Sequence, residues 1–163
     1  IAMNDFTYTR LKRQYMAQGI AIPTLRSKDL PPVGIAIDTS GSVGDLEMQQ
    51  FVSEIQSFSR LAWNFPVHLI MCDRQVTNYA NVMSRNIDHK KHLPPKGRGG
   101  TDFRPVFDKI RDEKIKISCL IYLTDTQGNF PEQRPNYPVL WISCCDRGQV
   151  PWGQLTFLDC NNK

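Results

Sequence analysis

The sequence has no apolar stretch long enough to cross a bilayer, which takes about 18–20 consecutive residues. Its longest apolar run, from Ile117 to Leu123, is short and is interrupted by Ser118. The basic N-terminal stretch also lacks the apolar core that a signal peptide needs. We therefore expect no membrane span and no membrane partner. Because the chain begins at Ile1 rather than Met, we also expect a longer parent protein.

Cysteine forms no recognisable framework in this sequence. The number of cysteines is five, which is odd, and no Cys-x-x-Cys pair occurs among them. A disulfide-stapled secreted domain usually has an even number, and a zinc ribbon needs paired cysteines. Four of the five lie in or beside apolar runs, which favours buried reduced thiols and a cytoplasmic location. The five are Cys72, Cys119, Cys144, Cys145 and Cys160.

No strong excess of charge of either sign is present. The net charge is +4 over 163 residues, with 40% hydrophobic and 22% charged residues, which is typical of one globular domain. Nucleic-acid-binding faces are usually more densely basic, so we do not expect a nucleic-acid partner. The densest basic segment, residues 85–98, is interpreted as a solvated loop. Its alternative role is a positive rim that attracts an acidic partner.

Several enzyme signatures are also missing. No Gly-x-Ser-x-Gly elbow occurs, and the glycine-rich stretch 97–101 lacks the lysine of a phosphate-binding loop. Asp38-Thr39-Ser40-Gly41 differs from the Asp-Thr-Gly of aspartic proteases because Ser40 intervenes. Phosphotransferases with an Asp nucleophile need a second Asp at the position of Ser40. A metal-dependent phosphoester hydrolase nevertheless stays open as an alternative.

The pattern along the chain predicts an α/β fold. Residues 1–32 are basic and proline-containing and are interpreted as an N-terminal arm and connector, and residues 33–163 as the domain. Apolar runs typical of buried strands occur at 33–37, 67–72, 117–123, 139–144 and 155–158. Helical spacing occurs after Pro105 and at 45–61, where Leu46, Val52 and Ile55 are among the residues of a broad apolar stripe. A hairpin partner is expected at 75–80, and loops at 84–100 and 127–138. Together they predict a mostly parallel sheet with one antiparallel edge strand and flanking helices.

Side chains with oxygen atoms follow the predicted strands. In open α/β sheets, ligands bind beyond the carboxyl ends of the strands, where the strand order switches. Carboxylates and hydroxyls without histidine or cysteine suit a hard cation, Mg²⁺ or Mn²⁺. The spacing Asp-x-Ser-x-Ser places alternate side chains on one side of an extended turn. The candidate ligands are Asp38, Ser40, Ser42, Thr101 and Asp125. As an alternative, the first three could cap the helix that follows.

Three segments together resemble the metal ion-dependent adhesion site of von Willebrand factor type A (VWA) domains. They are Asp38-Thr39-Ser40-Gly41-Ser42, Gly99-Gly100-Thr101-Asp102 and Leu123-Thr124-Asp125. The resemblance implies a Rossmann-like VWA fold with the ion on top of the sheet. It implies direct coordination by Ser40, Ser42 and Thr101, and by Asp38 and Asp125 either directly or through water. An acidic side chain of a partner protein would then fill the last position.

A narrower resemblance covers most of the chain. Residues 15–27, the Asp-Thr-Ser-Gly-Ser block and residues 99–107 resemble the VWA-like C-terminal domain of predicted bacterial metallopeptidases. In that family an upstream helical domain has a His-Glu-x-x-His motif, which the spacing of His68, His89 and His92 excludes here. We therefore expect this chain not to be an enzyme, whatever the parent protein contains.

The sequence differs from VWA domains in one segment, and four further residues are expected near the ion. VWA domains usually have a helix after the strand that ends near Asp125, whereas this chain has three prolines there. Four residues are expected beside the ion without holding it directly: Thr39, Asp102, Thr124 and Arg98. Asp102 fits a helix cap equally well, and Thr39 and Thr124 fit local hydrogen bonding better than coordination.

The predicted function is a Mg²⁺-dependent protein-interaction module that binds an exposed Asp or Glu of a partner. Cytoplasmic bacterial VWA proteins are often associated with AAA+ ATPases, so the resemblance suggests that class of partner. Two alternatives stay open. One is a metal-dependent phosphoester hydrolase that uses the same carboxylates, and the other is a nucleic-acid-binding domain that uses the basic arm and loop.

Overall fold

The structure is a computed structural model that describes residues 6–7, 24–25, 31–40, 46, 49–50, 52–53, 55–56, 65–92, 100–143 and 148–157. The chain divides into two compact units, Ile1–Leu30 and Pro31–Lys163. In the first unit, β1 (Phe6–Thr7) pairs antiparallel with β2 (Thr24–Leu25). No helix in the described ranges has the length and apolar character of a membrane span.

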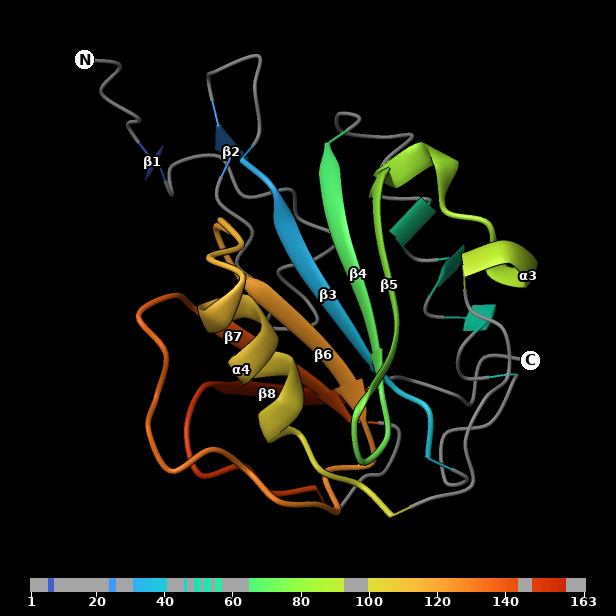
Figure 1. Cartoon of the computed structure of the whole chain (residues 1–163). Helices are drawn as coiled ribbons and strands as arrows, with labels where there is room; N and C mark the ends of the chain where they lie inside the picture. Colours follow the sequence, from blue (N-terminus) through green and yellow to red (C-terminus); the bar gives the residue numbers. More distant parts are fainter. Residues whose placement is uncertain are drawn as a thin grey trace. The chain divides into compact units, whose positions relative to one another are not determined.

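The second unit is built on a six-stranded sheet in the order β5-β4-β3-β6-β7-β8 (Figure 1). Every neighbouring pair is parallel except β4 and β5, so the only antiparallel strand of this sheet lies at its edge. The strands are β3 (Val33–Asp38), β4 (Pro66–Cys72), β5 (Val76–Met83), β6 (Leu120–Thr124), β7 (Val139–Ser143) and β8 (Gln154–Phe157). This arrangement confirms the predicted fold class, including the hairpin.

The central strands are buried on both faces, as their continuous apolar runs predict. Five of the six residues of β3 are buried, and successive side chains point to opposite faces of the sheet. Ala36 lies in one core cluster with Ile70, Tyr122 and Trp141. Asp38 is two residues after Ala36, so its side chain lies on the same face of the sheet, at the end of the strand.

Helix α4 (Arg104–Asp112) covers that face of the sheet (Figure 1). It begins with proline in its first turn, as predicted, because proline has no N–H to leave unsatisfied there. Its buried Val106, Phe107 and Ile110 pack into the cluster that contains Tyr122 and Trp141. The ring centroids of Phe107 and Trp141 are 6.0 Å apart, so the core beneath the site is largely aromatic.

Residues 46–56 are helical wherever the structure describes them. Val52 and Ile55 are buried, but Leu46 is 78% exposed, so its predicted place on the buried stripe is wrong. At about 100° per residue, Leu46 lies about 180° around the helix from Ile55. The apolar stripe that faces the sheet therefore does not include it.

The two predicted loops have different outcomes. Residues 125–138 contain no helix, as their prolines predict. The segment 84–100 instead begins with a 3₁₀ turn, η2 (Ser84–Asn86), and a short helix, α3 (His89–His92). Asp88 starts α3 by accepting a hydrogen bond from the backbone N–H of Lys91, at 3.3 Å. A single polar turn has too few residues to show helical periodicity.

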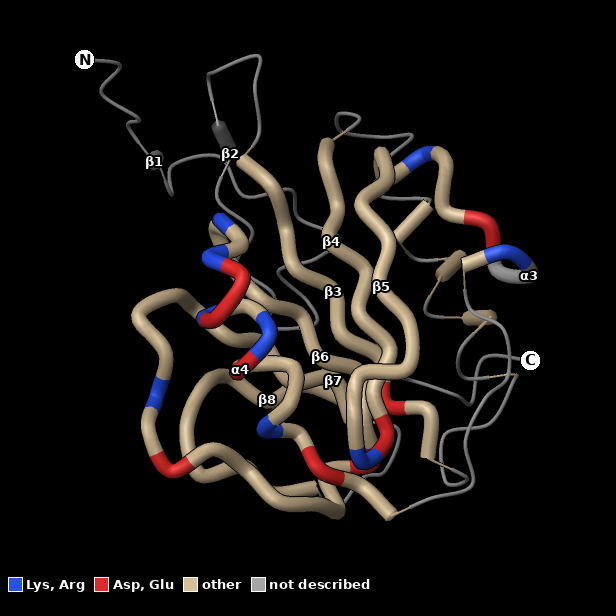
Figure 2. Tube along the Cα trace, viewed as in Figure 1, with Lys and Arg blue, Asp and Glu red and all other residues tan. Residues whose placement is uncertain are grey.

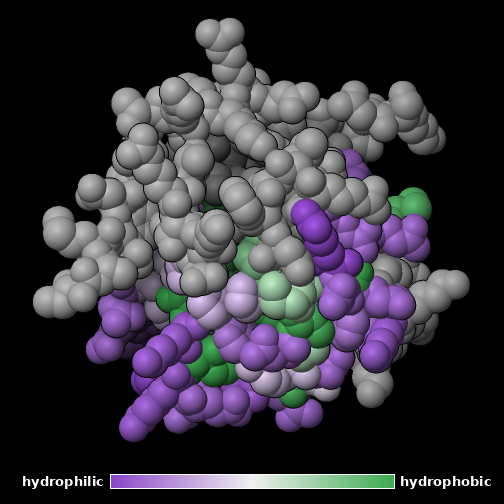
Figure 3. Space-filling view, turned by 90° about the horizontal axis from the view of Figure 1, so that it is seen from above, coloured by the Kyte–Doolittle hydropathy of each residue, from purple (hydrophilic) through white to green (hydrophobic). Residues whose placement is uncertain are grey.

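The surface has no large apolar area among the described residues. Figure 3 shows hydrophilic residues interspersed with small apolar areas on the face seen from above. The large hydrophobic side chains that are exposed in the described ranges, Leu46, Tyr79 and Phe157, belong to different elements. Isolated exposed apolar residues of this kind are normal and mark no interface by themselves.

Candidate metal centre

The candidate ligands within the described residues lie at the point where the strand order switches. From β3 the chain adds β4 and β5 on one side of the sheet, then returns to add β6 on the other side. Ile37 pairs in register with Leu123, so Asp38 and Thr124 end their strands side by side, and Asp125 follows directly. Figure 2 shows acidic positions gathered at these carboxyl ends. This is where open α/β sheets bind their ligands.

Asp38 is buried completely, with both carboxylate oxygens hydrogen-bonded. Its Oδ1 accepts from the backbone N–H of Ser40 at 2.8 Å, and its Oδ2 accepts from Thr124 Oγ1 at 3.0 Å. Burial raises the pKa of Asp38 above its ordinary value. The hydrogen bonds from Ser40 and Thr124 act against this rise, and the negative charge of Asp125 adds to it.

Asp125 is the second buried carboxylate, with 6% of its surface exposed. Its Oδ1 accepts from the backbone N–H of Gln127 at 2.8 Å, which holds the side chain in a local turn. No ion pair to Asp38 or Asp125 is present among the described residues. Two neighbouring carboxylates are therefore buried without a basic side chain that the structure shows to balance them.

The segment that contains Thr101 is tied across this edge of the sheet. The Asp102 N–H donates to Asp73 O at 2.8 Å, next to the end of β4. The Phe103 N–H donates to Asn129 O at 3.0 Å, in the loop after β6. Since β3 lies between β4 and β6, residues 101–103 cross beyond the end of β3. Thr101 is thus brought to the same edge as Asp38 and Asp125.

Asp102 is engaged with its own helix. Its carboxylate accepts from Arg104 Nε at 2.9 and 3.1 Å and from Arg104 Nη2 at 2.5 Å. Its Oδ1 also accepts from the Arg104 N–H at 3.0 Å, at the first residue of α4. Hydrogen bonding from Arg104 lowers the pKa of Asp102. This geometry favours the helix-start alternative for Asp102 over a role at the ion.

The two threonines that were expected beside the ion differ from each other. Thr124 makes local hydrogen bonds, because it donates to Asp38 and accepts from the Thr126 N–H at 3.0 Å. Thr39 Oγ1 is buried and has no hydrogen-bond partner among the described residues. Such an unpaired hydroxyl is costly unless something else satisfies it. Ser42 and Arg98 lie outside the described residues.

The donors present fit a hard divalent cation. They comprise two buried carboxylates, the hydroxyl-bearing Ser40 and Thr101, and the unpaired Thr39 hydroxyl, all of them oxygen atoms. Within the described ranges, no three His, Cys, Asp or Glu side chains gather as a metal cluster. His92 Nδ1 instead accepts from the Asp88 N–H at 2.9 Å. An oxygen-only donor set suits a hard cation better than Zn²⁺, which usually takes nitrogen or sulfur ligands.

The sequence interpretation missed the layer beneath Asp38. Cys72 pairs in register with Asp38, and its Sγ donates to Asp102 O at 3.4 Å. Burial, together with nearby carboxylates, raises the pKa of this thiol to about 12, so it is a neutral donor. Tyr122 is fully buried, and burial raises the pKa of its hydroxyl as well. These side chains come together only through the register of the paired strands, and no sequence motif indicates that register.

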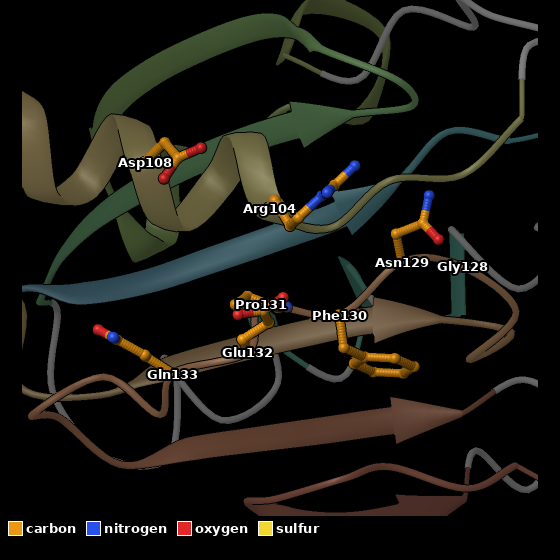
Figure 4. Close-up of a pocket in the computed structure, with 8 residues that line it drawn as sticks. All are labelled: Arg104, Asp108, Gly128, Asn129, Phe130, Pro131, Glu132 and Gln133. Carbon is orange, nitrogen blue, oxygen red and sulfur yellow. The ribbon is translucent and has the colours of Figure 1, made fainter.

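A cavity of about 450 Å³ lies beside the site, between the start of α4 and residues 128–133 (Figure 4). Arg104 and Asn129 come to it from the two segments that flank the candidate ligands. Gly128 lies close beneath Thr101, because a Cβ atom there would be 2.8 Å from Thr101 Cγ2. The proline-rich loop thus shapes the surface where VWA domains usually have a helix.

The comparison with protein families agrees with this geometry. The family described as VWA-like domain (DUF2201) matches residues 33–159 of the chain. The chain belongs to this family. The match covers every strand of the six-stranded sheet and all of the candidate ligands. Membership in this family establishes the type of domain.

Individual proteins extend the comparison. An uncharacterized protein of Thermotoga maritima is 29% identical over 113 residues, which are 69% of this chain and 27% of that protein. The chain therefore spans about a quarter of that relative. The solved ArnB paralog VWA2 from Sulfolobus acidocaldarius has a TM-score of 0.51 at 14% identity, with 71% of this chain and 35% of that chain covered. This likeness concerns the fold alone.

A second solved structure is the conserved hypothetical protein BatB from Bacteroides thetaiotaomicron. Its TM-score is 0.46 at 14% identity, with 69% of this chain and 67% of that chain covered.

Proposed function

We propose that this VWA-like domain is a Mg²⁺-dependent protein-interaction module that binds an exposed Asp or Glu of a partner protein. The observation that supports it most is the pair of buried carboxylates, Asp38 and Asp125, at the switch point of the sheet. They influence each other electrostatically, and no described basic residue forms an ion pair with either. A bound cation would remove this imbalance.

The residues proposed to hold Mg²⁺ are Asp38, Ser40, Ser42, Thr101 and Asp125, with Mn²⁺ as a substitute. When bound, the ion supplies a positive centre that can accept a carboxylate oxygen from outside the domain. Mg²⁺ prefers an octahedral set of oxygen ligands and keeps some positions for water or a partner. The chain's own contribution is to hold its oxygens in place before a partner arrives.

A binding role fits these residues better than catalysis. The sequence has no Gly-x-Ser-x-Gly elbow and no phosphate-binding lysine in its glycine-rich stretch, so the serines and aspartates of the proposed site lack the motifs of these enzyme classes. We therefore propose that this chain is not an enzyme, and that any catalysis in its parent protein resides elsewhere. An AAA+ ATPase is the partner class that the VWA resemblance suggests. The free thiols of Cys72 and Cys119 are compatible with the proposed cytoplasmic location.

Isothermal titration calorimetry with MgCl₂ tests the ion site directly. We expect the wild-type chain to bind one Mg²⁺, and EDTA to reverse the binding. The Asp38→Ala, Asp125→Ala double variant should stay folded by circular dichroism and lose the heat of binding. A double variant that binds Mg²⁺ as the wild type does would contradict the proposed ligand set.

The partner interaction is tested with an immobilised array of peptides that have one central Asp, Glu, Asn or Gln. We expect Asp and Glu peptides to be retained in Mg²⁺ and released by EDTA, whereas Asn and Gln peptides are not retained. Binding of the chain to DNA or RNA that is unaffected by EDTA and weakens steeply as the salt concentration rises would instead favour the nucleic-acid alternative. Mg²⁺-dependent turnover of p-nitrophenyl phosphate would favour the hydrolase alternative.

A further inference from the structure

The backbone immediately after Asp125 has an unusual conformation. Thr126 has φ = 66°, in the left-handed region that β-branched residues seldom adopt. The residue is buried, with 9% of its surface exposed, so the surrounding structure must hold it there. Backbone conformations of this kind gather at functional sites, where they place a neighbouring group. The question is which group the Thr126 turn places.

One answer is the Thr124 hydroxyl. The turn directs the Thr126 N–H back to Thr124 Oγ1, at 3.0 Å. That hydroxyl has a single proton, and its oxygen is also 3.0 Å from Asp38 Oδ2. Because a carboxylate oxygen can only accept, the proton of Thr124 goes to Asp38 while its lone pair accepts from Thr126. We call this chain, Thr126 N–H to Thr124 Oγ1 to Asp38 Oδ2, the threonine relay.

The same turn also holds the second carboxylate. With Thr126 in this conformation, the Gln127 N–H reaches Asp125 Oδ1 at 2.8 Å. The Thr126 hydroxyl donates to the carbonyl oxygen of Asp125 at 2.6 Å, which closes the turn. One left-handed residue thus orients the carboxylates of both Asp38 and Asp125.

A glycine from the segment between β7 and β8 packs against this turn. A Cβ atom at Gly148 would lie 2.7 Å from Thr126 Oγ1 and 2.8 Å from Ser143 Oγ. Only a residue without a side chain can approach so closely. This contact helps to keep Thr126 in place.

We propose that Thr124 is a positioning residue for the metal centre, and that the left-handed turn at Thr126 sets the direction in which the Thr124 hydroxyl donates. This inference rests on the proposed function, because its role is to hold Asp38 ready for Mg²⁺. The hydroxyl is required only as a donor to Asp38 and an acceptor from the Thr126 N–H. At Thr126, only the backbone conformation and its N–H are required.

Four variants separate these requirements. Thr124→Val keeps the shape of the side chain but removes the hydroxyl, and Thr124→Ser is the matched control that keeps the hydroxyl. Thr124→Cys keeps a weaker donor of similar size and serves if the valine variant does not fold. Thr126→Gly keeps the N–H and adopts the left-handed conformation readily. Urea unfolding in EDTA reports whether each variant folds.

The first measurement needs no metal. Amide hydrogen exchange by NMR in EDTA follows the Thr126 N–H, which the relay should protect. We expect Thr124→Val to speed its exchange at least tenfold relative to the unchanged core amides of β3, and Thr124→Ser to leave it within about threefold. Equal exchange in the wild type and the valine variant overturns the relay.

The second measurement is the Mg²⁺ dissociation constant by calorimetry. We expect Thr124→Val to weaken binding at least tenfold, Thr124→Cys to fall between valine and wild type, and Thr124→Ser and Thr126→Gly to stay within about threefold. A valine variant that binds as the wild type does overturns the positioning role alone. A Thr126→Gly variant that loses as much affinity as the valine variant overturns the claim that the backbone suffices. A wild type that binds neither Mg²⁺ nor Mn²⁺ overturns the proposed function and the positioning role together.

Discussion

Two acidic regions lie at the same edge of the sheet and differ in the groups that contact their carboxylates. The first, which we call the floor, comprises Asp38, Thr124 and Asp125, all of them buried. The second, which we call the rim, comprises Asp102 and Arg104, whose side chains are 18% and 55% exposed. The floor carboxylates receive hydrogen bonds from neutral donors, whereas the rim carboxylate has an arginine of its own.

The comparison separates a site from a structural ion pair. In the rim, the charge of the carboxylate is balanced, since Arg104 neutralises Asp102 and lowers the pKa of its carboxyl. In the floor, no described basic side chain balances the carboxylates. Burial raises the pKa of Asp38, and the neighbouring Asp125 raises it further. A buried charge without a partner is costly, which makes the floor the region where an external cation would have the largest effect.

The largest effect expected from this comparison is the loss of the ion. Asp38→Asn keeps the size of the side chain and removes its charge, so we expect Mg²⁺ binding to weaken by about 100-fold or more in calorimetry. In the metal-free variant, removal of a buried charge at neutral pH favours the folded state, while the amide NH₂ faces a donor, either the Ser40 N–H or the Thr124 hydroxyl, and costs one hydrogen bond. Asp102→Asn is the matched control, and a comparable loss of Mg²⁺ affinity there would break the distinction between floor and rim.

The next effect concerns the junction of the two regions. A Cβ atom at Gly128 would lie 2.8 Å from Thr101 Cγ2 and 2.9 Å from Phe103 Cζ. Gly128→Ala should therefore push Thr101 away and lower the free energy of unfolding by about 1–3 kcal/mol, as overpacking usually does. Urea unfolding measures the stability, and Mg²⁺ titration should show weaker binding. Unchanged values of both would contradict the placement of Thr101.

A smaller effect is the dependence of stability on pH, which should have opposite signs in the two regions. Because the folded-state pKa of Asp38 lies above its ordinary value of 3.8, its stabilising contribution is present below that value. That contribution is lost as the pH rises through the raised pKa. For Asp102, whose pKa is lowered, the contribution is present above 3.8 and is lost as the pH falls through the lowered pKa.

Urea unfolding of the metal-free protein at several pH values checks these signs. The stability of Asp38→Asn relative to that of the wild type should increase as the pH rises above 3.8. The disadvantage of Asp102→Asn should shrink as the pH falls below that value. Parallel pH profiles for the wild type and Asp38→Asn would show that Asp38 is not the titrating group.

The smallest effect is expected at Arg104. Exposed ion pairs contribute little to stability, since water and salt screen them. Arg104→Ala should leave both urea unfolding and the Mg²⁺ dissociation constant nearly unchanged, with a dissociation constant within about twofold of the wild type. A larger loss of Mg²⁺ affinity would place the rim within the metal centre. Arg111→Ala, which removes the exposed ion pairs of Arg111 with Asp108 and Asp112 on α4, is the control for helix stability.

Much of the fold was predictable from local pattern. The strands β3 and β4 and the start of α4 have strong local signals, namely mostly apolar runs and a proline in a first turn. The exposed Leu46 shows the limit of such patterns, because an apolar residue need not lie on the buried face. The short helix α3 shows another limit, since four polar residues have no periodicity to detect.

The candidate site was predictable only in part. The motif around Asp38 and the post-strand position of Asp125 can be found in the sequence, because both directly follow apolar runs, at the strand ends where open α/β sheets bind ligands. The role of Thr124 as a donor to Asp38 could not be found there, since the two residues are 86 positions apart. Asp102 and Arg104 are close together in the sequence. Only the side-chain geometry, however, shows that Arg104 already engages the Asp102 carboxylate.

The sequence by itself determined the α/β pattern and which oxygen-bearing side chains follow the strands, since these depend on residue identity and spacing. Only the tertiary structure decided which carboxylates are unbalanced and which are already paired. Burial and hydrogen bonding set that distinction, and both arise from strand register. The left-handed turn at Thr126 likewise appears only in the fold, because a threonine adopts it only where packing from elsewhere in the chain holds it.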